Sequence, residues 1–264
     1  MSSKQMSVFR KRKITYIAAF AIILALYLFS SLITEFHISE GVRAFPDAVM
    51  WMAEKLIPDA KAFERFPKIL EKLFETTLLS VAVTVIAAVC AFFFSLLGSK
   101  TTRLNGIINR LVRMIASFFR NVPDVVWAML LMFSFGQNIL TGFFALFFTT
   151  FGLLTRAFIE TIDEVSSSSI EALNASGADF MQIVFQAIIP SSVTGLITWV
   201  LYMIETNIRS STLIGILTAT GIGYLFDMYY KRLEFGSASL VVLSIVVLVI
   251  LIEMLSNMLR KVIQ

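Results

Sequence analysis

The chain has 264 residues, of which 58% are hydrophobic and 15% charged, with a formal net charge of +4. Soluble domains carry about 25% charged residues, so this composition excludes an ordinary soluble protein and predicts an integral membrane protein. The basic residues form no stripe with interleaved aromatic side chains, so nucleic-acid binding is not expected. The single cysteine, Cys90, and the single histidine, His37, predict neither an intrachain disulfide nor a metal site.

The N-terminal part of the chain predicts one membrane span and an amphipathic segment after it. Five Lys or Arg residues within the first 13 precede an apolar run at residues 14–33. This run is too long for a typical signal peptide and lacks a small-residue cleavage site. We therefore expect a retained span with a cytoplasmic N-terminus, the alternative being a cleaved signal peptide. Residues 34–75 have apolar side chains at helical spacing, and we expect short amphipathic segments at the outer interface of the membrane.

The rest of the chain predicts five further spans. They are expected at 76–97, from within 107–116 to about 135, at 141–161, from 189 to 204 or slightly beyond, and at about 237–259. Basic residues between positions 100 and 113, and Arg260 with Lys261, favour a cytoplasmic location for these ends, so both termini are expected inside. Pro123 removes a helical hydrogen bond and predicts a kink in the third span.

Three ionisable residues fall within or beside these spans. Arg120 either lines a path or snorkels at the inner end of the third span, and we favour the second interpretation. Glu205 and Arg209 are one helical turn apart, which predicts an ion pair within the helix. Counting from Pro190 at about 1.5 Å per residue places them roughly 22 to 29 Å along the fifth span, close to its outer end. This pair either lies on a path or makes a structural contact with the glycine turn that follows.

A polar interruption at residues 160–190 predicts a helix, a turn and a second helix. Ser168 and Glu171 have the spacing of a capping box, and Asp179 and Gln182 repeat it. Gly177, between them, can adopt a positive φ and end the first helix. The small residues around the turn would let it enter a groove on another protein.

This interruption resembles the cytoplasmic coupling loop of ABC-importer permeases, which reads E-A-x-x-A-x-G with a proline about a dozen residues later. The matching positions are Glu171, Ala172, Ala175, Gly177 and Pro190. Residues 202–223 resemble the phosphonate-type permease pattern Y-x-x-E-x-N-x-R-S with a small-residue turn ending in G-I-G. Residues 120–129 resemble the R-x-x-P-x-x-x-W-A element of that family, and the likeness covers roughly residues 70–260.

Other positions either extend this resemblance or depart from it. Glu160 and Glu164 stand where the family has an acidic pair before the coupling loop. The family commonly has glycines at the positions of Ala219 and Thr220. It also has a Gly-Leu pair where this chain has Ser169 and Ile170.

The resemblance implies a fold and an organisation for the chain. The implied fold is an all-α membrane protein of about six spans with the ABC type I importer permease core. Residues 1–75 would form an N-terminal span and outer amphipathic loop, and residues 76–264 the core, with the coupling loop at 164–182. The implied ATPase-coupling residues are Glu171, Ala172, Ala175, Gly177, Asp179 and Pro190. The implied candidates for the translocation path are Glu205, Asn207, Arg209, Gly221 and Gly223.

The resemblance also implies a function and partners. The chain would be a permease that imports a phosphonate, phosphite or related phosphorus oxyanion across a bacterial cell membrane. It would form a homodimer with the path at its two-fold interface. Two cytoplasmic ATPase subunits would carry ATP and Mg²⁺, and an extracellular binding protein would deliver the substrate.

The absence of common catalytic motifs argues against an enzyme, but it leaves three rival hypotheses open. There is no G-x-x-x-x-G-K-[ST], H-E-x-x-H, C-x-x-C or G-x-S-x-G, so we expect no enzyme activity and no cofactor bound by this chain. The first rival is an ion-coupled secondary transporter, which would show inverted repeats and acidic residues deep in broken spans. The second is an ABC permease for another small solute, such as an amino acid. The third is a scaffold without transport activity.

Overall fold

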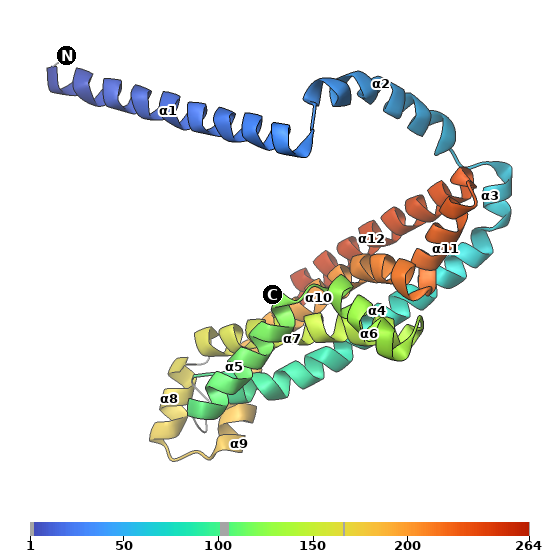
Figure 1. The fold of residues 1–264 in the computed structure, drawn as a ribbon. Helices are drawn as coiled ribbons and strands as arrows, with labels where there is room; N and C mark the ends of the chain where they lie inside the picture. Colours follow the sequence, from blue (N-terminus) through green and yellow to red (C-terminus); the bar gives the residue numbers. More distant parts are fainter. Residues whose placement is uncertain (1–2, 101–105, 166, 264) are drawn as a thin grey trace. The chain divides into compact units, whose positions relative to one another are not determined.

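The computed structural model describes residues 3–100, 106–165 and 167–263, and within these ranges the regular secondary structure is helical (Figure 1). The predicted all-α class is therefore confirmed. The chain divides into two compact units, Met1–Lys55 and Leu56–Gln264. A boundary after residue 75, as expected from the sequence, would fall inside a helix that begins at Phe66.

The Met1–Lys55 unit consists of two helices, α1 (Ser3–Thr34) and α2 (Ile38–Lys55). The stretch Lys11–Thr34 of α1 is long and apolar enough to cross a membrane. The two helices are separated by Glu35, which has a φ of +54°. None of the residues of α2 is buried, as expected for an amphipathic helix whose apolar face lies against a membrane.

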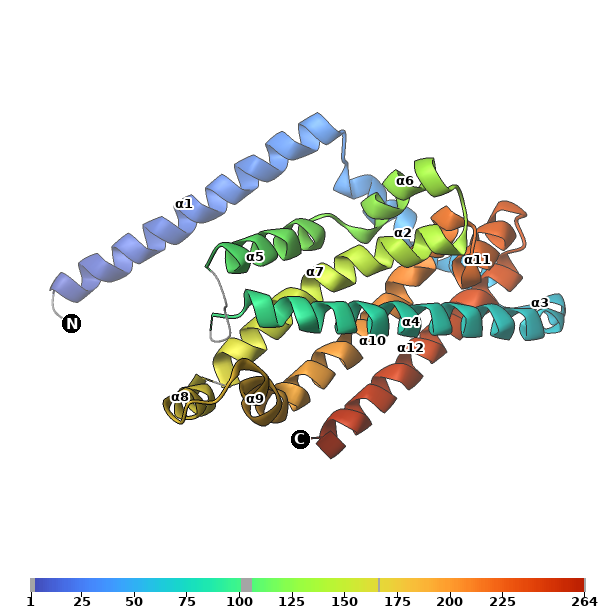
Figure 2. The ribbon, with the colours of Figure 1, turned by 90° about the horizontal axis from the view of Figure 1, so that it is seen from below.

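The Leu56–Gln264 unit is a helical bundle built around α7. Its helices are α3 (Ala60–Glu64), α4 (Phe66–Gly98), α5 (Gly106–Asn121), α6 (Asp124–Phe135), α7 (Ile139–Val165), α8 (Ser167–Ala175), α9 (Phe180–Ile183), the π-helical turn Val184–Ile188, α10 (Ile189–Thr218), α11 (Gly221–Lys231) and α12 (Phe235–Ile263). Helix α7 contacts α4, α5, α6 and α10 (Figure 2). Its apolar window is 61% buried, compared with 22% for α12, so α7 is central and α12 peripheral within this unit.

The number of helices that could span a membrane agrees with the sequence. Within the described ranges, five helices are long and apolar enough, and the bent pair α5 and α6 makes a sixth if it is one span. The second span starts at Phe66, earlier than predicted. The fifth is longer than predicted at both ends, because helical structure continues from Phe180 to Thr218. The orientation of the termini stays a prediction.

The third span is broken at Pro123, where the sequence predicts a kink. Helices α5 and α6 meet at 89°. Pro123 has extended dihedral angles, φ −58° and ψ 147°, and is the N-cap of α6, so its missing N–H interrupts the helical ladder. The two interpretations of Arg120 stay open, and its backbone packs on Gly152, the central residue of α7. A Cβ on Gly152 would lie 2.6 Å from the Arg120 nitrogen. Arg120 therefore lies beside the middle of α7.

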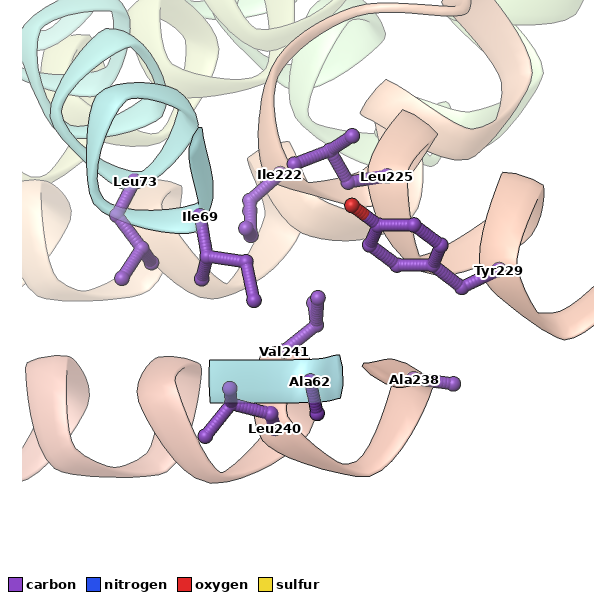
Figure 3. Packing of buried hydrophobic residues seen from close by; sticks show 9 residues of the cluster. All are labelled: Ala62, Ile69, Leu73, Ile222, Leu225, Tyr229, Ala238, Leu240 and Val241. Carbon is purple, nitrogen blue, oxygen red and sulfur yellow. The ribbon is translucent and has the colours of Figure 1, made fainter. Parts of the chain in front are cut away.

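A cluster of buried apolar residues joins α3, α4, α11 and α12 (Figure 3). Five of its members, Ala62, Ile69, Ile222, Leu225 and Val241, are at most 1% exposed. Helix α4 begins at this cluster and ends beside the α8–α9 region. We call the end of the unit at this cluster the far end. We call the opposite end, where the short helices α8 and α9 form a helical hairpin, the hairpin end.

An ion pair beside this cluster stabilises the packing of the far end. Arg65, just before α4, donates hydrogen bonds to both carboxylate oxygens of Glu234, just before α12, and to Ser237. Its guanidinium also lies 4.9 Å from the centre of the Tyr229 ring. The hydrogen bonds and the charge of Arg65 hold the pKa of Glu234 below its usual range.

Candidate functional site

The predicted helix-turn-helix is present, and its turn is formed by Gly177. Helix α8 ends at Ala175, and Gly177 has a φ of +82°. The Ala178 N–H donates to the Leu173 carbonyl at 3.1 Å, the long bond of a Schellman motif. We call α8, the turn and α9 the hairpin, residues 167–183.

The second cap of the hairpin is confirmed. The Asp179 carboxylate accepts from the Met181 and Gln182 N–H groups at 2.6 and 3.2 Å, and the Gln182 side chain accepts from the Asp179 N–H at 2.9 Å. The first predicted cap depends on the side chain of Ser168, which lies outside the described residues.

The hairpin has one face on the bundle and one face exposed. Ile170 and Ile183 pack with Leu96 of α4 and Ile162 of α7. The predicted coupling residues on the other face are exposed, namely Glu171, Ala172, Ala175, Gly177 and Asp179. The apolar contacts therefore hold the hairpin on the bundle without covering the residues expected to meet a partner.

Two large exposed apolar residues, one in α9 and one in the π turn after it, were missed by the sequence analysis. Met181 and Phe185 are 61% and 63% exposed. They are four positions apart, so they lie on one helical face. Ile183 and Ala187 between and beyond them are buried. In the sequence, these four apolar residues fall on two faces of one helix. A second apolar face is the signal that could have identified Met181 and Phe185 as part of a docking surface.

The second helix of the hairpin does not end at Pro190 but continues through it into the fifth span. The Ile189 N–H donates to the Val184 carbonyl, five residues back, in a π-helical turn at Val184–Ile188. Pro190 has no N–H and its ring clashes with a normal helical turn before it. The π turn accommodates the proline, so the hairpin and α10 are joined by continuous helix.

A hydrogen-bonded carboxylate, Asp163, lies at the base of the hairpin. Its Oδ1 accepts from the Ser99 hydroxyl at 2.5 Å and from the Lys100 N–H at 2.8 Å, and its Oδ2 accepts from Arg113 Nη2 at 2.9 Å. Arg113 also donates to the Gly98 carbonyl at 2.9 Å. This network joins the C-terminal end of α4 to α5 and α7.

The sequence analysis singled out the acidic neighbours of Asp163 instead. Glu160 and Glu164 are exposed, and Glu160 pairs with Arg156 on the same helix at 2.5 Å. Asp163 follows the fully buried Ile159 by four positions and Ile162 by one. Its place on the buried face of α7 was therefore visible in the apolar pattern.

Asn207, one of the candidates for the path, lies between three helices and is 3% exposed. Its amide nitrogen donates to Thr84 of α4 at 2.8 Å and to Thr150 of α7 at 2.9 Å. Ser80 donates to the Asn207 carbonyl at 3.2 Å. These bonds hold α10 against α4 and α7.

The predicted ion pair between Glu205 and Arg209 is present, with Arg209 Nη2 2.8 Å from Glu205 Oε1. Helix α10 continues for nine residues beyond Arg209, to Thr218, so the pair lies farther from the end of the helix than predicted. The Ser211 and Thr218 hydroxyls bond back to helical carbonyls at 2.9 Å each, so this polar segment remains helical.

Gly221 and Gly223, the last two candidates for the path, are required by packing. A Cβ on Gly223 would lie 2.0 Å from the Thr212 carbonyl oxygen, and one on Gly221 2.4 Å from Thr76 Oγ1. The Ile222 N–H donates to Thr76 Oγ1 at 2.9 Å. A cavity of about 290 Å³ adjoins this turn, lined in part by Glu75, Thr76, Ser211, Thr220 and Gly221.

Comparison with known proteins finds transport permeases that align with most of this chain. The phosphite transport system permease protein PtxC of Stutzerimonas stutzeri is 25% identical over 220 residues, which cover 83% of this chain and 79% of that protein. The phosphate-import permease protein PhnE of Mycolicibacterium smegmatis is 27% identical over 71% of this chain and 35% of that protein.

Comparison with solved structures supports the fold. A chain from the structure of the MetNI methionine ABC transporter in inward-facing conformations superposes with a TM-score of 0.62 and 20% identity, covering 75% of this chain and 98% of that chain. Residues 85–264, which include the hairpin and all of α10, match the family model for the binding-protein-dependent transport system inner membrane component. The chain therefore belongs to this family of multi-pass ABC-importer permeases.

Proposed function

We propose that this chain is the membrane-spanning subunit of an ABC importer for phosphite, a phosphonate or a related phosphorus oxyanion. Two copies form the path at their two-fold interface in the inner or plasma membrane of a bacterial cell. Two cytoplasmic ATPase subunits bind ATP and Mg²⁺, and an extracellular binding protein delivers the substrate. The chain itself binds no cofactor and hydrolyses no ATP.

One observation carries the proposed substrate class. The two relatives described above are named for phosphite and phosphate import, and each match covers more than two thirds of this chain. Arg209 suits such a substrate, because a guanidinium donates two parallel hydrogen bonds to an oxyanion and stays charged at physiological pH. Its side chain is 49% exposed and lies nine residues before the end of α10, which supports a position on the path.

The hairpin suits the coupling step. Its exposed face carries small residues and Met181, and Phe185 is exposed in the π turn that follows, whereas the other face of the hairpin is packed on α4 and α7. We infer that closure of the ATPase subunits moves the two docked hairpins toward each other and changes the spans from inward- to outward-facing. The Asp163 network would transmit this motion, because it joins three helices at the base of the hairpin.

The proposal is tested with the complete complex in proteoliposomes. Labelled phosphite, methylphosphonate, phosphate and methionine are offered with the binding protein, with and without ATP. We expect ATP-dependent uptake of at least one of the three phosphorus oxyanions and none of methionine. Uptake driven by an ion gradient without ATP would favour a secondary transporter, and uptake of methionine alone would contradict the substrate class.

The role of Arg209 is tested separately. Arg209→Gln removes the charge and the fork, and we expect uptake per assembled complex to fall at least about tenfold while ATPase activity remains. Arg156→Gln is a matched control, because Arg156 is also an arginine paired with a carboxylate one turn away. Normal uptake in Arg209→Gln would remove Arg209 from the path.

A further inference from the structure

A second arginine lies beside the Glu205–Arg209 pair. Arg260, in the last turn of α12, has its Nη2 3.8 Å from Glu205 Oε2, within ion-pair range but too far for a hydrogen bond. Arg209 holds the other oxygen of the same carboxylate, Oε1, at 2.8 Å. The sequence analysis treated Arg260 only as a marker of the cytoplasmic end of the last span.

Arg260 also carries donors that lack an acceptor. Its Nε and Nη2 atoms are buried, and neither donates to any group in the described part of the chain. These two nitrogens can form one edge of the guanidinium fork, with the geometry that binds two oxygens of a carboxylate or a phosphorus oxyanion. Leaving such an edge unpaired away from water is costly, so an acceptor is expected there during part of the transport cycle.

The local charge favours an anion as that acceptor. Two guanidinium groups and one carboxylate give the cluster a net charge of +1, and both oxygens of Glu205 are already directed at an arginine. Glu205 is only 12% exposed, whereas Arg209 is 49% exposed. An entering anion would therefore meet the guanidinium of Arg209 first, with the carboxylate and the buried edge of Arg260 behind it.

We propose that Arg260 binds the substrate oxyanion through its Nε–Nη2 edge and forms, with Arg209, a two-arginine site on the path. This inference rests on the proposed function and extends it from α10 to α12. Glu205 occupies the space between the arginines and competes with the oxyanion for them. The competition limits the affinity of the site, so the anion binds and is then released.

The test measures KM and kcat for uptake in proteoliposomes, normalised to assembled complex, with labelled phosphite, methylphosphonate and phosphate. Arg260→Gln is expected to raise KM about tenfold or more for the transported anion. Arg260→Lys keeps the charge but loses the fork, so its KM should also rise. Lys261→Gln is the matched control, because Lys261 is the exposed neighbouring cation. Its KM should equal that of the wild type.

Glu205→Gln should change KM in the opposite direction. Removing the competing carboxylate should lower KM about threefold or more and lower kcat, because release becomes slower. If Arg260 only held α12 against α10, Arg260→Gln and Glu205→Gln would lower the melting temperature together and leave KM unchanged. That result overturns the inference.

The outcomes separate this inference from the proposed function. Wild-type uptake of a phosphorus oxyanion with an unchanged KM in Arg260→Gln overturns the inference alone. A wild-type complex that imports none of the three anions overturns the proposed function and the inference with it. If Arg260→Gln does not assemble, Arg260→Lys decides, and a wild-type KM in that variant overturns the inference.

Discussion

In the Leu56–Gln264 unit, a glycine with a positive φ lies in a turn at each end. We call the turn at Gly177 the hairpin turn and the turn at Gly221 the far turn, and the two have different surroundings. At the hairpin end, a Cβ added to Gly177 would meet no heavy atom within 4 Å. At the far end, a Cβ added to Gly221 would lie 2.4 Å from Thr76 Oγ1. The hairpin turn is open and the far turn is packed against its own chain. The open turn agrees with the docking surface that we propose for the hairpin, whereas the packed turn stabilises the fold.

Each end is also stabilised by an ion pair between an arginine and a carboxylate that are distant in sequence. Arg113 and Asp163 lie at the base of the hairpin, and Arg65 and Glu234 lie beside the apolar cluster of the far end. At the hairpin end this tie leaves exposed apolar residues in front of it, among them Met181 at 61% exposure. The hairpin is thus held by an ion pair on one side and exposes apolar side chains on the other. This arrangement suits the proposed role, in which movement of a second subunit is transmitted to the spans.

The largest expected effect comes from Gly177→Val, which would break the open turn. Its φ of +82° is strongly unfavourable for a β-branched residue, and the strain is about 1–2 kcal/mol or more. We expect substrate-stimulated ATPase activity of the reconstituted complex to fall at least about tenfold, because the hairpin would no longer present its exposed face.

The control for this change is Gly177→Asn. Asparagine tolerates a left-handed backbone far better than valine does, so the turn should form and coupling should largely remain. Normal coupling in Gly177→Val would mean that the turn is not needed for docking, and the contrast between the two ends would lose its functional meaning.

Asp163→Asn should give the next largest effect by loosening the base of the hairpin. It removes the charge that Arg113 Nη2 approaches at 2.9 Å, and it weakens the bonds from Ser99 and Lys100. We expect a loss of about 2 kcal/mol in stability, measured as a lower melting temperature of the purified complex. Glu160→Gln, which removes an exposed pair within one helix, should cost less than about 0.5 kcal/mol. Equal losses in the two variants would contradict a special role for Asp163.

The hairpin could be predicted from the sequence because its signals are local. The Asp179 cap, the glycine at 177 and the apolar spacing act over four residues or fewer. The spans were also predictable, because apolar length is a property of a continuous segment. The end of the fifth span was missed because Ser and Thr look like loop residues in sequence, whereas their hydroxyls here bond to helical carbonyls.

The ties between helices could not be predicted in the same way. Arg113 and Asp163 are 50 positions apart, and Arg260 meets Glu205 only because α12 packs against α10. Gly221 and Gly223 were noticed through a motif, but the atoms that require them, on Thr76 and Thr212, are known only from the packing. Periodicity identifies a buried face, but it does not identify the partner on that face.

A smaller effect is expected at the far turn, where Ala219 has a φ of +56°. This is the left-handed conformation that glycine adopts without strain, and alanine does not. Ala219→Gly should therefore raise stability by roughly 0.5–1 kcal/mol, seen as a melting temperature higher by about 2 °C. Ala82→Gly, at an exposed helical position in α4, should have the opposite sign. A lower melting temperature in Ala219→Gly would show that the packed turn does not store this strain.

The smallest expected effect concerns the pH dependence of the tie at the far end. Arg65 holds the pKa of Glu234 below its usual range. A lowered carboxyl pKa contributes stability above the pKa of the unfolded chain, about 4.3, and this contribution is lost as the pH falls through the folded value. The wild type should thus melt above Glu234→Gln at pH 7, and the difference should shrink by about pH 3.5. Glu64→Gln, at an exposed position of α3, is the matched control. A constant difference between wild type and Glu234→Gln at both pH values would mean that the tie does not depend on the charge of Glu234.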